Sequence, residues 1–173
     1  MRRLLNFLKA EGATSAIEFA FVAPVMLLMA AGITEIGRYY SVYDASNRLA
    51  DQYASAWADC TDVPTGTCAT ELSIFSSANT IANIVPELTP SQTTLSMFQI
   101  TMVGTTPTVV SSYPSGAALS GTQSAAAASA FTSGQSGVVV TVSYNHSLVY
   151  FPATMASILG SVLNISYTVV QLK

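Results

Sequence analysis

The first third of the chain is patterned as one long helix whose N-terminal part is almost entirely apolar. Between Phe19 and Ile33 the sequence has no charged residue, and Glu18 is the only charge within residues 13–34. This run of 22 residues is long enough to cross a bilayer, because a membrane-spanning helix needs ~20 largely apolar residues. We therefore predict a transmembrane helix over residues 13–36.

Beyond Ile33 the apolar positions recur at three- and four-residue steps, which is the spacing of one helix face. The predicted stripe consists of Ile36, Tyr40, Tyr43, Asn47, Ala50, Ala54 and Trp57. Residues 37–59 are therefore predicted to continue the same helix, which would be ~70 Å long at 1.5 Å per residue. Because this length exceeds the apolar core of a bilayer, the second half must project from the membrane or pack on another part of the protein.

The second half of the chain shows the two-residue alternation of half-buried strands. Val138, Val140, Val142 and Tyr144 share one predicted face, with Thr141, Ser143 and Asn145 on the other. Three strands are predicted: Leu95–Val103, Val138–Tyr150 and Asn164–Leu172.

Short helices and loops complete the prediction for residues 60–173. We expect short helices at residues 71–85 and 152–163, and a long Ser-, Gly- and Ala-rich loop at 111–137 with one helical turn near residues 125–131. The predicted fold class is α+β: a long N-terminal transmembrane and amphipathic helix, followed by a small antiparallel β-sheet domain with short helices.

The distribution of charge predicts a topology and excludes some classes of function. Half of the residues are hydrophobic and 9% are charged, against roughly 25% in soluble proteins. With a net charge of −3 the chain lacks the clustered Lys and Arg of a nucleic-acid-binding protein. Arg2, Arg3 and Lys9 precede the apolar run, which predicts a cytoplasmic N-terminus and an extracytoplasmic remainder. Tyr39 and Tyr40 are then placed to form an aromatic belt at the outer membrane interface.

The two cysteines, Cys60 and Cys68, lie on the predicted extracytoplasmic side. In an oxidising compartment they are expected to form a disulfide, which would close a short loop and stabilise the fold by ~2–3 kcal/mol. The alternative is two unrelated buried thiols.

No combination of residues in the sequence indicates catalysis. His146 is the only histidine; we interpret it as a solvent-facing strand residue, because Ser147 beside it is not in a nucleophile turn. One histidine and two cysteines are too few for a typical zinc site. The chain is predicted to be no enzyme and to need no metal or cofactor.

Glu18 is unusual because a carboxylate inside an apolar helix costs ~3 kcal/mol or more when it lies deep in a bilayer. Two interpretations are open. The side chain reaches the lipid head groups at the cytoplasmic interface, or it meets a positive partner such as an α-amino group that proteolysis has released.

The stretch from Gly12 to Pro24, GATSAIEFAFVAP, resembles the N-terminus of the TadE/TadG-like pseudopilins, which are minor components of Tad (tight adherence, type IVc) pilus systems. The resemblance continues through GITEIGR at residues 32–38 and covers about residues 11–58. It implies a pilin-like fold and a leader, residues 1–12, that a prepilin peptidase removes. On the Flp-type pattern, in which the cut follows Gly, the scissile bond is Gly12–Ala13.

The resemblance implies that Glu18 and Phe19, which match the family's motif, act in processing and assembly. In the Flp-type pattern Glu is the fifth mature residue, whereas Glu18 is the sixth after a cut at Gly12–Ala13. A cut after Ala13 restores the fifth position but loses the Gly. Glu35 and Arg38, three residues apart, are either a solvated pair within the helix or a contact between subunits in a helical bundle.

The resemblance implies a structural protein of the bacterial inner membrane that helps assemble or prime an adhesive pilus, with the extracellular filament as a second location that stays open. Its implied partners are the prepilin peptidase, other pilins and pseudopilins, and the inner-membrane assembly platform. An alternative is an extracytoplasmic binding module, either secreted after an ordinary signal peptidase cuts behind the small residues 30–32 or retained by an uncut signal anchor. A tethered periplasmic enzyme is a third reading, for which the sequence offers no catalytic constellation.

Overall fold

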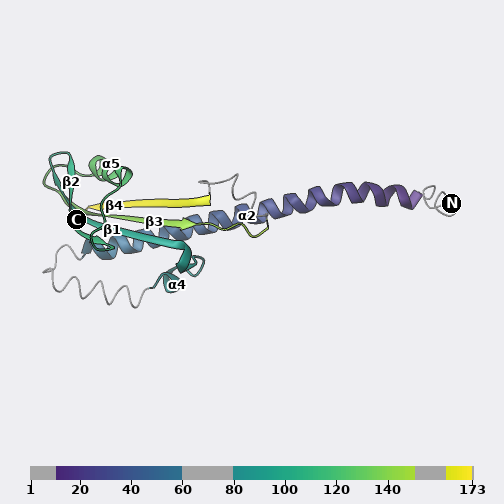
Figure 1. Cartoon of the computed structure of the whole chain (residues 1–173), viewed down its shortest axis with the longest axis horizontal. Coiled ribbons are helices and arrows are strands. Elements are labelled where there is room, and N and C mark those ends of the chain that lie inside the picture. The colour runs from purple at the N-terminus through teal and green to yellow at the C-terminus, as the bar shows by residue number, and fades with distance from the viewer. Residues whose placement is uncertain (1–10, 60–79, 151–162, 173) are drawn as a thin grey trace.

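The chain consists of one long helix and a small head domain that packs on the C-terminal half of that helix (Figure 1). A computed structural model describes residues 11–59, 80–150 and 163–172, with side chains from Ser15 onward. Helix α2 (Glu11–Asp59) is 49 residues long and continues through Pro24 without a break. The predicted α+β class and the single long N-terminal helix are confirmed.

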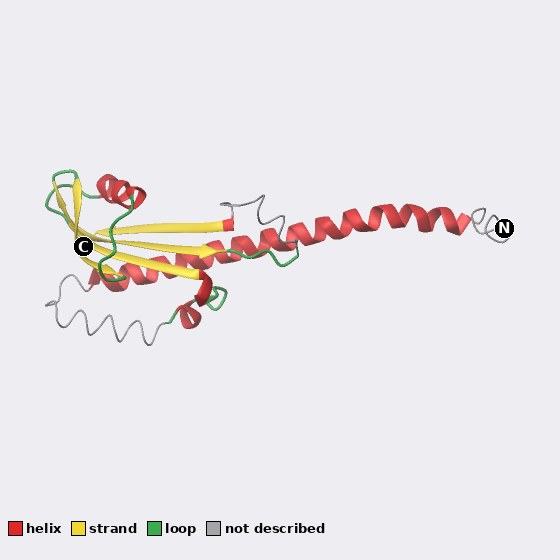
Figure 2. Ribbon diagram, in the orientation of Figure 1, coloured by secondary structure: helices red, strands yellow, loops and turns green. Residues whose placement is uncertain are grey.

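The head domain contains an antiparallel sheet of four strands in the order β2-β1-β3-β4 (Figure 2). The strands are β1 (Thr93–Val103), β2 (Thr106–Tyr113), β3 (Ser136–Asn145) and β4 (Asn164–Leu172). The prediction for β4 is confirmed over its full length. The predicted second strand was too long at its end, because β3 stops at Asn145, where its pairing with β4 also ends.

Strand β2 was not predicted, and residues 111–113 were assigned to a loop. This strand lies at the edge of the sheet and is mostly exposed, so it lacks the apolar alternation that a half-buried strand shows. Gly104, with φ of +67°, provides the left-handed turn residue between β1 and β2, a conformation that glycine adopts without steric cost.

The sheet is covered on both faces, so the prediction of half-buried strands was wrong for β3. On one face Val138, Val140 and Val142 of β3 form a core with Leu49 and Trp57 of α2. On the other face a second cluster joins the sheet to helix α5 (Gly121–Ala130) and the residue that follows it: Phe98, Ile100, Met102, Val139, Ala127 and Phe131. Alternate positions of β3 are therefore buried in two different cores.

Helix α5 occupies the middle of the segment that we expected to be a long loop, and it is longer than the single helical turn predicted near residues 125–131. Its N-cap is Ser120, whose hydroxyl accepts the backbone N–H of Gln123, while the Gln123 side chain accepts the backbone N–H of Ser120 at 2.8 Å. This reciprocal capping box stabilises the first turn. Gln123 also donates to Thr141 at 2.9 Å, so the same side chain ties the helix to the sheet.

Ser120→Ala should lower the free energy of unfolding by about 1 kcal/mol, because the first turn of α5 loses its capping hydroxyl. Chemical denaturation of the full chain in detergent micelles, followed by Trp57 fluorescence, measures this change. Ser129→Ala is the matched control. The Ser129 hydroxyl bonds only to Ala126 inside the same helix, so we expect this variant to stay within about 0.5 kcal/mol of wild type. Equal effects of the two substitutions would contradict the capping role.

The face of α2 that packs on the sheet differs from the predicted stripe. Ala50, Ala54 and Trp57 are buried as expected. Ile36 and Tyr40, by contrast, are 58% and 66% exposed, so the first part of the predicted stripe does not pack on the sheet. The buried positions there are instead Glu35, Val42, Ala45, Ser46 and Leu49.

Several predicted features fall partly or wholly outside the described residues. Of the helix expected at residues 71–85, the described part contains the short helix α4 (Ile81–Ile84), and the 3-10 turn η2 (Pro90–Gln92) precedes β1. The expected helix at 152–163 lies outside, apart from its last residue. Cys60 and Cys68 also lie outside, and their disulfide stays a prediction.

Candidate functional site

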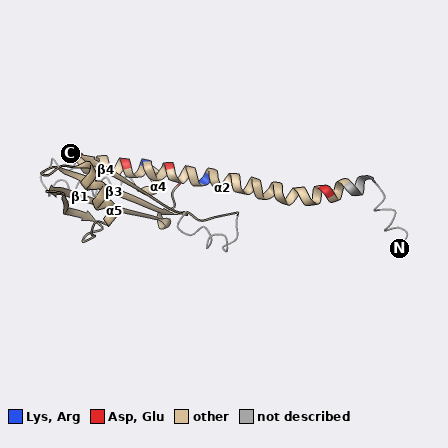
Figure 3. Cartoon of the chain, turned by 90° about the horizontal axis from the view of Figure 1, so that it is seen from above, with Lys and Arg blue, Asp and Glu red and all other residues tan. Residues whose placement is uncertain are grey.

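The N-terminal half of α2 extends away from the head domain with its apolar side chains uncovered. Figure 3 shows how little charge this half carries. Phe21, Leu27 and Met29 are between 64% and 76% exposed. By length and composition α2 qualifies as a membrane-crossing helix, and no residue of its most apolar window is buried in the head domain. A soluble environment does not suit such a surface, whereas a bilayer or a bundle of similar helices does.

The residues assigned to processing lie at the start of this helix. Gly12 and Ala13 belong to the first turns of α2. Glu18 and Phe19 are exposed, and within the described residues Glu18 makes no ion pair. The Glu18 carboxylate is therefore accessible to a group from another molecule.

Glu35 forms the junction between α2 and the head domain. Its Oε1 accepts the backbone N–H groups of Val149 and Tyr150 at 2.6 and 2.9 Å, and its Oε2 accepts a hydrogen bond from Arg38 at 3.2 Å. The predicted Glu35–Arg38 pair is therefore present within the helix. It is not solvated on the acidic side, however, because Glu35 is only 5% exposed.

His146 lies in the same junction, and its prediction as a solvent-facing residue was wrong. The residue is 3% exposed, and its backbone N–H donates to the carbonyl of Leu163 at 2.9 Å. The Nε2 atom lies 3.6 Å from Glu35 Oε2, and Tyr39 contacts the imidazole edge-to-face at a centroid distance of 6.0 Å. Since β3 ends one residue earlier, strand alternation no longer determines where this side chain lies.

The junction contains an acid and an imidazole, but its geometry is that of a structural contact. The side chains of Glu35 and His146 are 6% and 2% exposed, which leaves a substrate no access to them. Among the described residues no group of three potential metal ligands exists. The junction fixes the loop after β3 against α2, and nothing in its geometry indicates a reaction.

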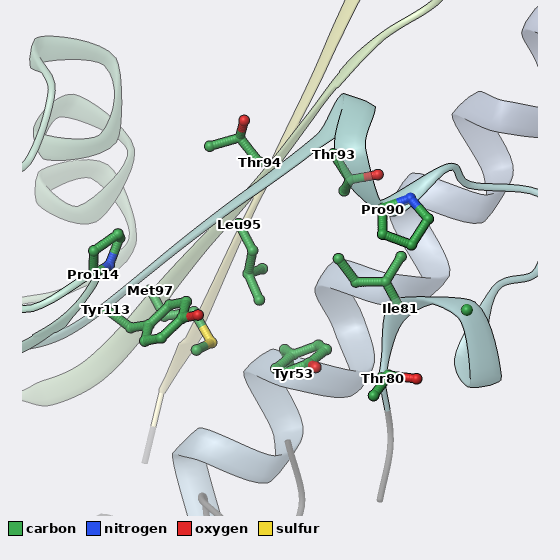
Figure 4. Close-up of a pocket in the computed structure, with 11 residues that line it drawn as sticks. Tyr53, Thr80, Ile81, Pro90, Thr93, Thr94, Leu95, Met97, Tyr113 and Pro114 are labelled. Atoms are coloured by element: carbon green, nitrogen blue, oxygen red, sulfur yellow. The ribbon is translucent and has the colours of Figure 1, made fainter. Parts of the chain in front are cut away.

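A pocket of about 540 Å³ opens between α2, α4 and the β1–β2 side of the sheet (Figure 4). Its lining is mainly aliphatic and aromatic, and Tyr53 and Tyr113 supply the phenol groups. Burial raises the pKa of Tyr53, and nearby Tyr113 raises this pKa further. Among the lining residues that the structure describes there is no Asp, Glu, His, Lys or Arg, so the pocket offers no acid–base pair.

Residues 13–54 match the family model described as TadE-like protein. This segment of the chain is similar to TadE-like proteins. It contains the uncovered apolar half of α2, with Glu18 and Phe19, and also the Glu35–Arg38 pair. The match relates this segment to Tad pilus proteins. Comparisons with curated proteins and with solved structures give no significant match.

The matched segment ends four residues before the last buried residue of α2, Ala58. The matched segment therefore holds both the exposed apolar helix and most of the helix surface on which the sheet packs. Sequence reasoning identified Glu35 and Arg38 but missed His146, Val149 and Tyr150 as their neighbours. No local pattern reports these contacts, because Glu35 and Val149 are 114 positions apart in the chain.

Proposed function

We propose that this protein is a minor pseudopilin that helps assemble or prime a Tad/Flp-type adhesive pilus through its N-terminal helix. The observation that carries the proposal is the TadE-like match over a helix whose apolar half has no partner in the head domain. Such a helix packs with similar helices in a membrane or a filament, while the head domain is displayed outside the cytoplasm.

Glu18 gives this packing a preferred register. After a cut at Gly12–Ala13, the new α-amino group of one subunit meets the Glu18 carboxylate of its neighbour. In an apolar environment an unpaired charge is costly, so this pairing favours one axial position over others even where it adds little net stability. The exposed position of Glu18 on α2 leaves it free for this contact.

The proposal assigns a role to each segment of the chain. Residues 1–12 are the leader, 13–36 cross the inner membrane with the N-terminus in the cytoplasm, 37–59 extend the helix into the periplasm, and 60–173 form the extracytoplasmic domain. The partners are the prepilin peptidase, other pilins and pseudopilins, and the inner-membrane assembly platform. No cofactor is needed for this role.

Determination of the mature N-terminus tests the proposal. In cells with the prepilin peptidase we expect the purified protein to begin at Ala13, and in cells without the peptidase to retain the leader. A first residue near Ile33, independent of that peptidase, would instead indicate a secreted binding module released by an ordinary signal peptidase. An unprocessed chain in both strains would also contradict the proposed leader.

A further inference from the structure

The loop after β3 exposes an apolar tip beside α2. Val149 and Tyr150 are 61% and 59% exposed, although Glu35 accepts the backbone N–H of both residues. Figure 2 shows this loop running along α2 beyond the ends of the strands, toward the N-terminal half of the helix. The two side chains are therefore held at the level of α2 where the uncharged stretch ends.

Helix α2 exposes apolar side chains at the same level. Ile33, Ile36 and Tyr40 are 69%, 58% and 66% exposed. From Thr34 to Tyr40 the helix advances about 9 Å at 1.5 Å per residue, close to the head-group layer of about 5–8 Å on each side of the hydrocarbon core. We call these three residues, with Val149 and Tyr150, the juxtamembrane apolar surface.

A lipid bilayer fits this surface because the surface is continuous with the stretch of α2 that crosses the membrane. Tyrosine is enriched at the head-group level, where its ring is in contact with acyl chains and its hydroxyl with water. Arg38 is at the same level, with a side chain that is 43% exposed, and long basic side chains reach lipid phosphates from such positions.

We propose that Val149 and Tyr150 insert into the head-group layer of the bilayer that α2 crosses, so that the head domain contacts the membrane at a second place. This inference rests on the proposed membrane span. A single helix leaves the head domain free to rotate and tilt, whereas two contacts restrict its orientation toward neighbouring subunits. Glu35 is the positioning residue, because it holds the backbone of the tip against α2.

Fluorescence quenching in vesicles tests the insertion. The full chain is reconstituted into phosphatidylcholine vesicles in which the acyl chains are brominated close to the head groups, and Val149→Trp adds a second fluorophore. Native Trp57 is 7% exposed and lies about 35 Å beyond Thr34 along the helix, so wild-type emission should be unaffected. We expect the intensity that Val149→Trp adds to fall at least twofold in the brominated vesicles.

Two matched variants complete the design. Val103→Trp places the probe at a similarly exposed position, 65%. Val103 lies at the opposite end of the sheet from the loop after β3, because the other end of β1, Thr93, pairs with Tyr144 near the end of β3. The emission of this variant should not change in the brominated vesicles. Met29→Trp places the probe within the apolar stretch, where the native side chain is 64% exposed, and should be quenched. Tyr150→Trp repeats the measurement if Val149→Trp does not fold.

The outcomes separate this inference from the proposed span. Quenching of Met29→Trp without quenching of Val149→Trp or Tyr150→Trp overturns the insertion and leaves the span intact. Absence of quenching in all three variants overturns both. A third outcome is that brominated lipid does not quench Val149→Trp, whereas the shielding of its indole from water increases with the ratio of protein to lipid. This result assigns the surface to a second copy of the chain and also overturns the insertion.

Discussion

Glu35→Ala is expected to lower the free energy of unfolding by about 2–3 kcal/mol, because it removes the acceptor of two backbone N–H groups. The Glu35 carboxylate is 5% exposed and accepts hydrogen bonds from Val149, Tyr150 and Arg38. Alanine leaves those donors and the buried imidazole of His146 without the oxygen atoms that now face them. The loop after β3 should then separate from α2.

Denaturation of the full chain in detergent micelles measures this effect. Trp57 is the only tryptophan in the chain and is buried between α2 and the sheet, so its emission reports loss of that core. Glu35→Gln retains an amide oxygen for Val149 and Tyr150, but it replaces the oxygen that accepts from Arg38 with an NH2 group, so the charge and that hydrogen bond are both lost. Its effect should therefore lie between those of wild type and Glu35→Ala.

Asp44→Ala is the matched control for Glu35→Ala. Asp44 is an exposed carboxylate on the same helix and pairs with Arg48 at 3.4 Å, with a side chain that is 72% exposed. Exposed pairs of this kind contribute at most about 1 kcal/mol. If Glu35→Ala costs no more than Asp44→Ala, Glu35 does not anchor the loop.

The elements with a long, regular pattern could be predicted from the sequence. The apolar run and the helical spacing that follows it predicted α2, which begins at Glu11 instead of residue 13 and ends at Asp59. Strand β4 has β-branched and aromatic residues at alternate positions and was predicted over its full length. In these segments the local preference and the tertiary contacts favour the same structure.

Other elements depend on contacts that a local pattern does not contain. Helix α5 consists mainly of Ala and Ser, so its short apolar side is weak, yet Phe131 and Ala127 fill the second core against β1 and β3. Strand β2 is exposed and is held mainly by pairing with β1. Its hydrogen bonds to β1 define it, and its side chains show no buried face.

The candidate site shows the same division between local and distant information. The resemblance of its N-terminal motif and its position within an apolar helix singled out Glu18 as a candidate from the sequence alone. Glu35 was also identified, but its burial depends on a loop that returns to α2 from the far end of β3. Tyr40, which the sequence assigned to an aromatic belt at the membrane interface, is 66% exposed on α2.

Glu18→Gln is expected to reduce piliation at least tenfold while the head domain remains folded. The amide has nearly the same size as the carboxylate but carries no charge, so it cannot neutralise the α-amino group of a neighbouring subunit. Since Glu18 is exposed and lies far from the sheet along α2, Trp57 emission and the free energy of unfolding should match those of wild type. Counting of filaments by electron microscopy and crosslinking to other pilins measure the loss.

Asp51→Asn makes the same change of carboxylate to amide at an exposed position of the same helix, and we expect normal piliation. Glu18→Asp keeps the charge with a shorter side chain and should restore part of the crosslinking. If Glu18→Asp retains part of the crosslinking that Glu18→Gln loses, the loss depends on charge, as the pairing with an amine requires. A loss that Glu18→Asp does not relieve points to side-chain length, and normal processing, crosslinking and piliation in Glu18→Gln would exclude Glu18 from assembly. Because the two Glu18 variants leave the head domain unchanged, these results separate helix packing from the stability of the fold.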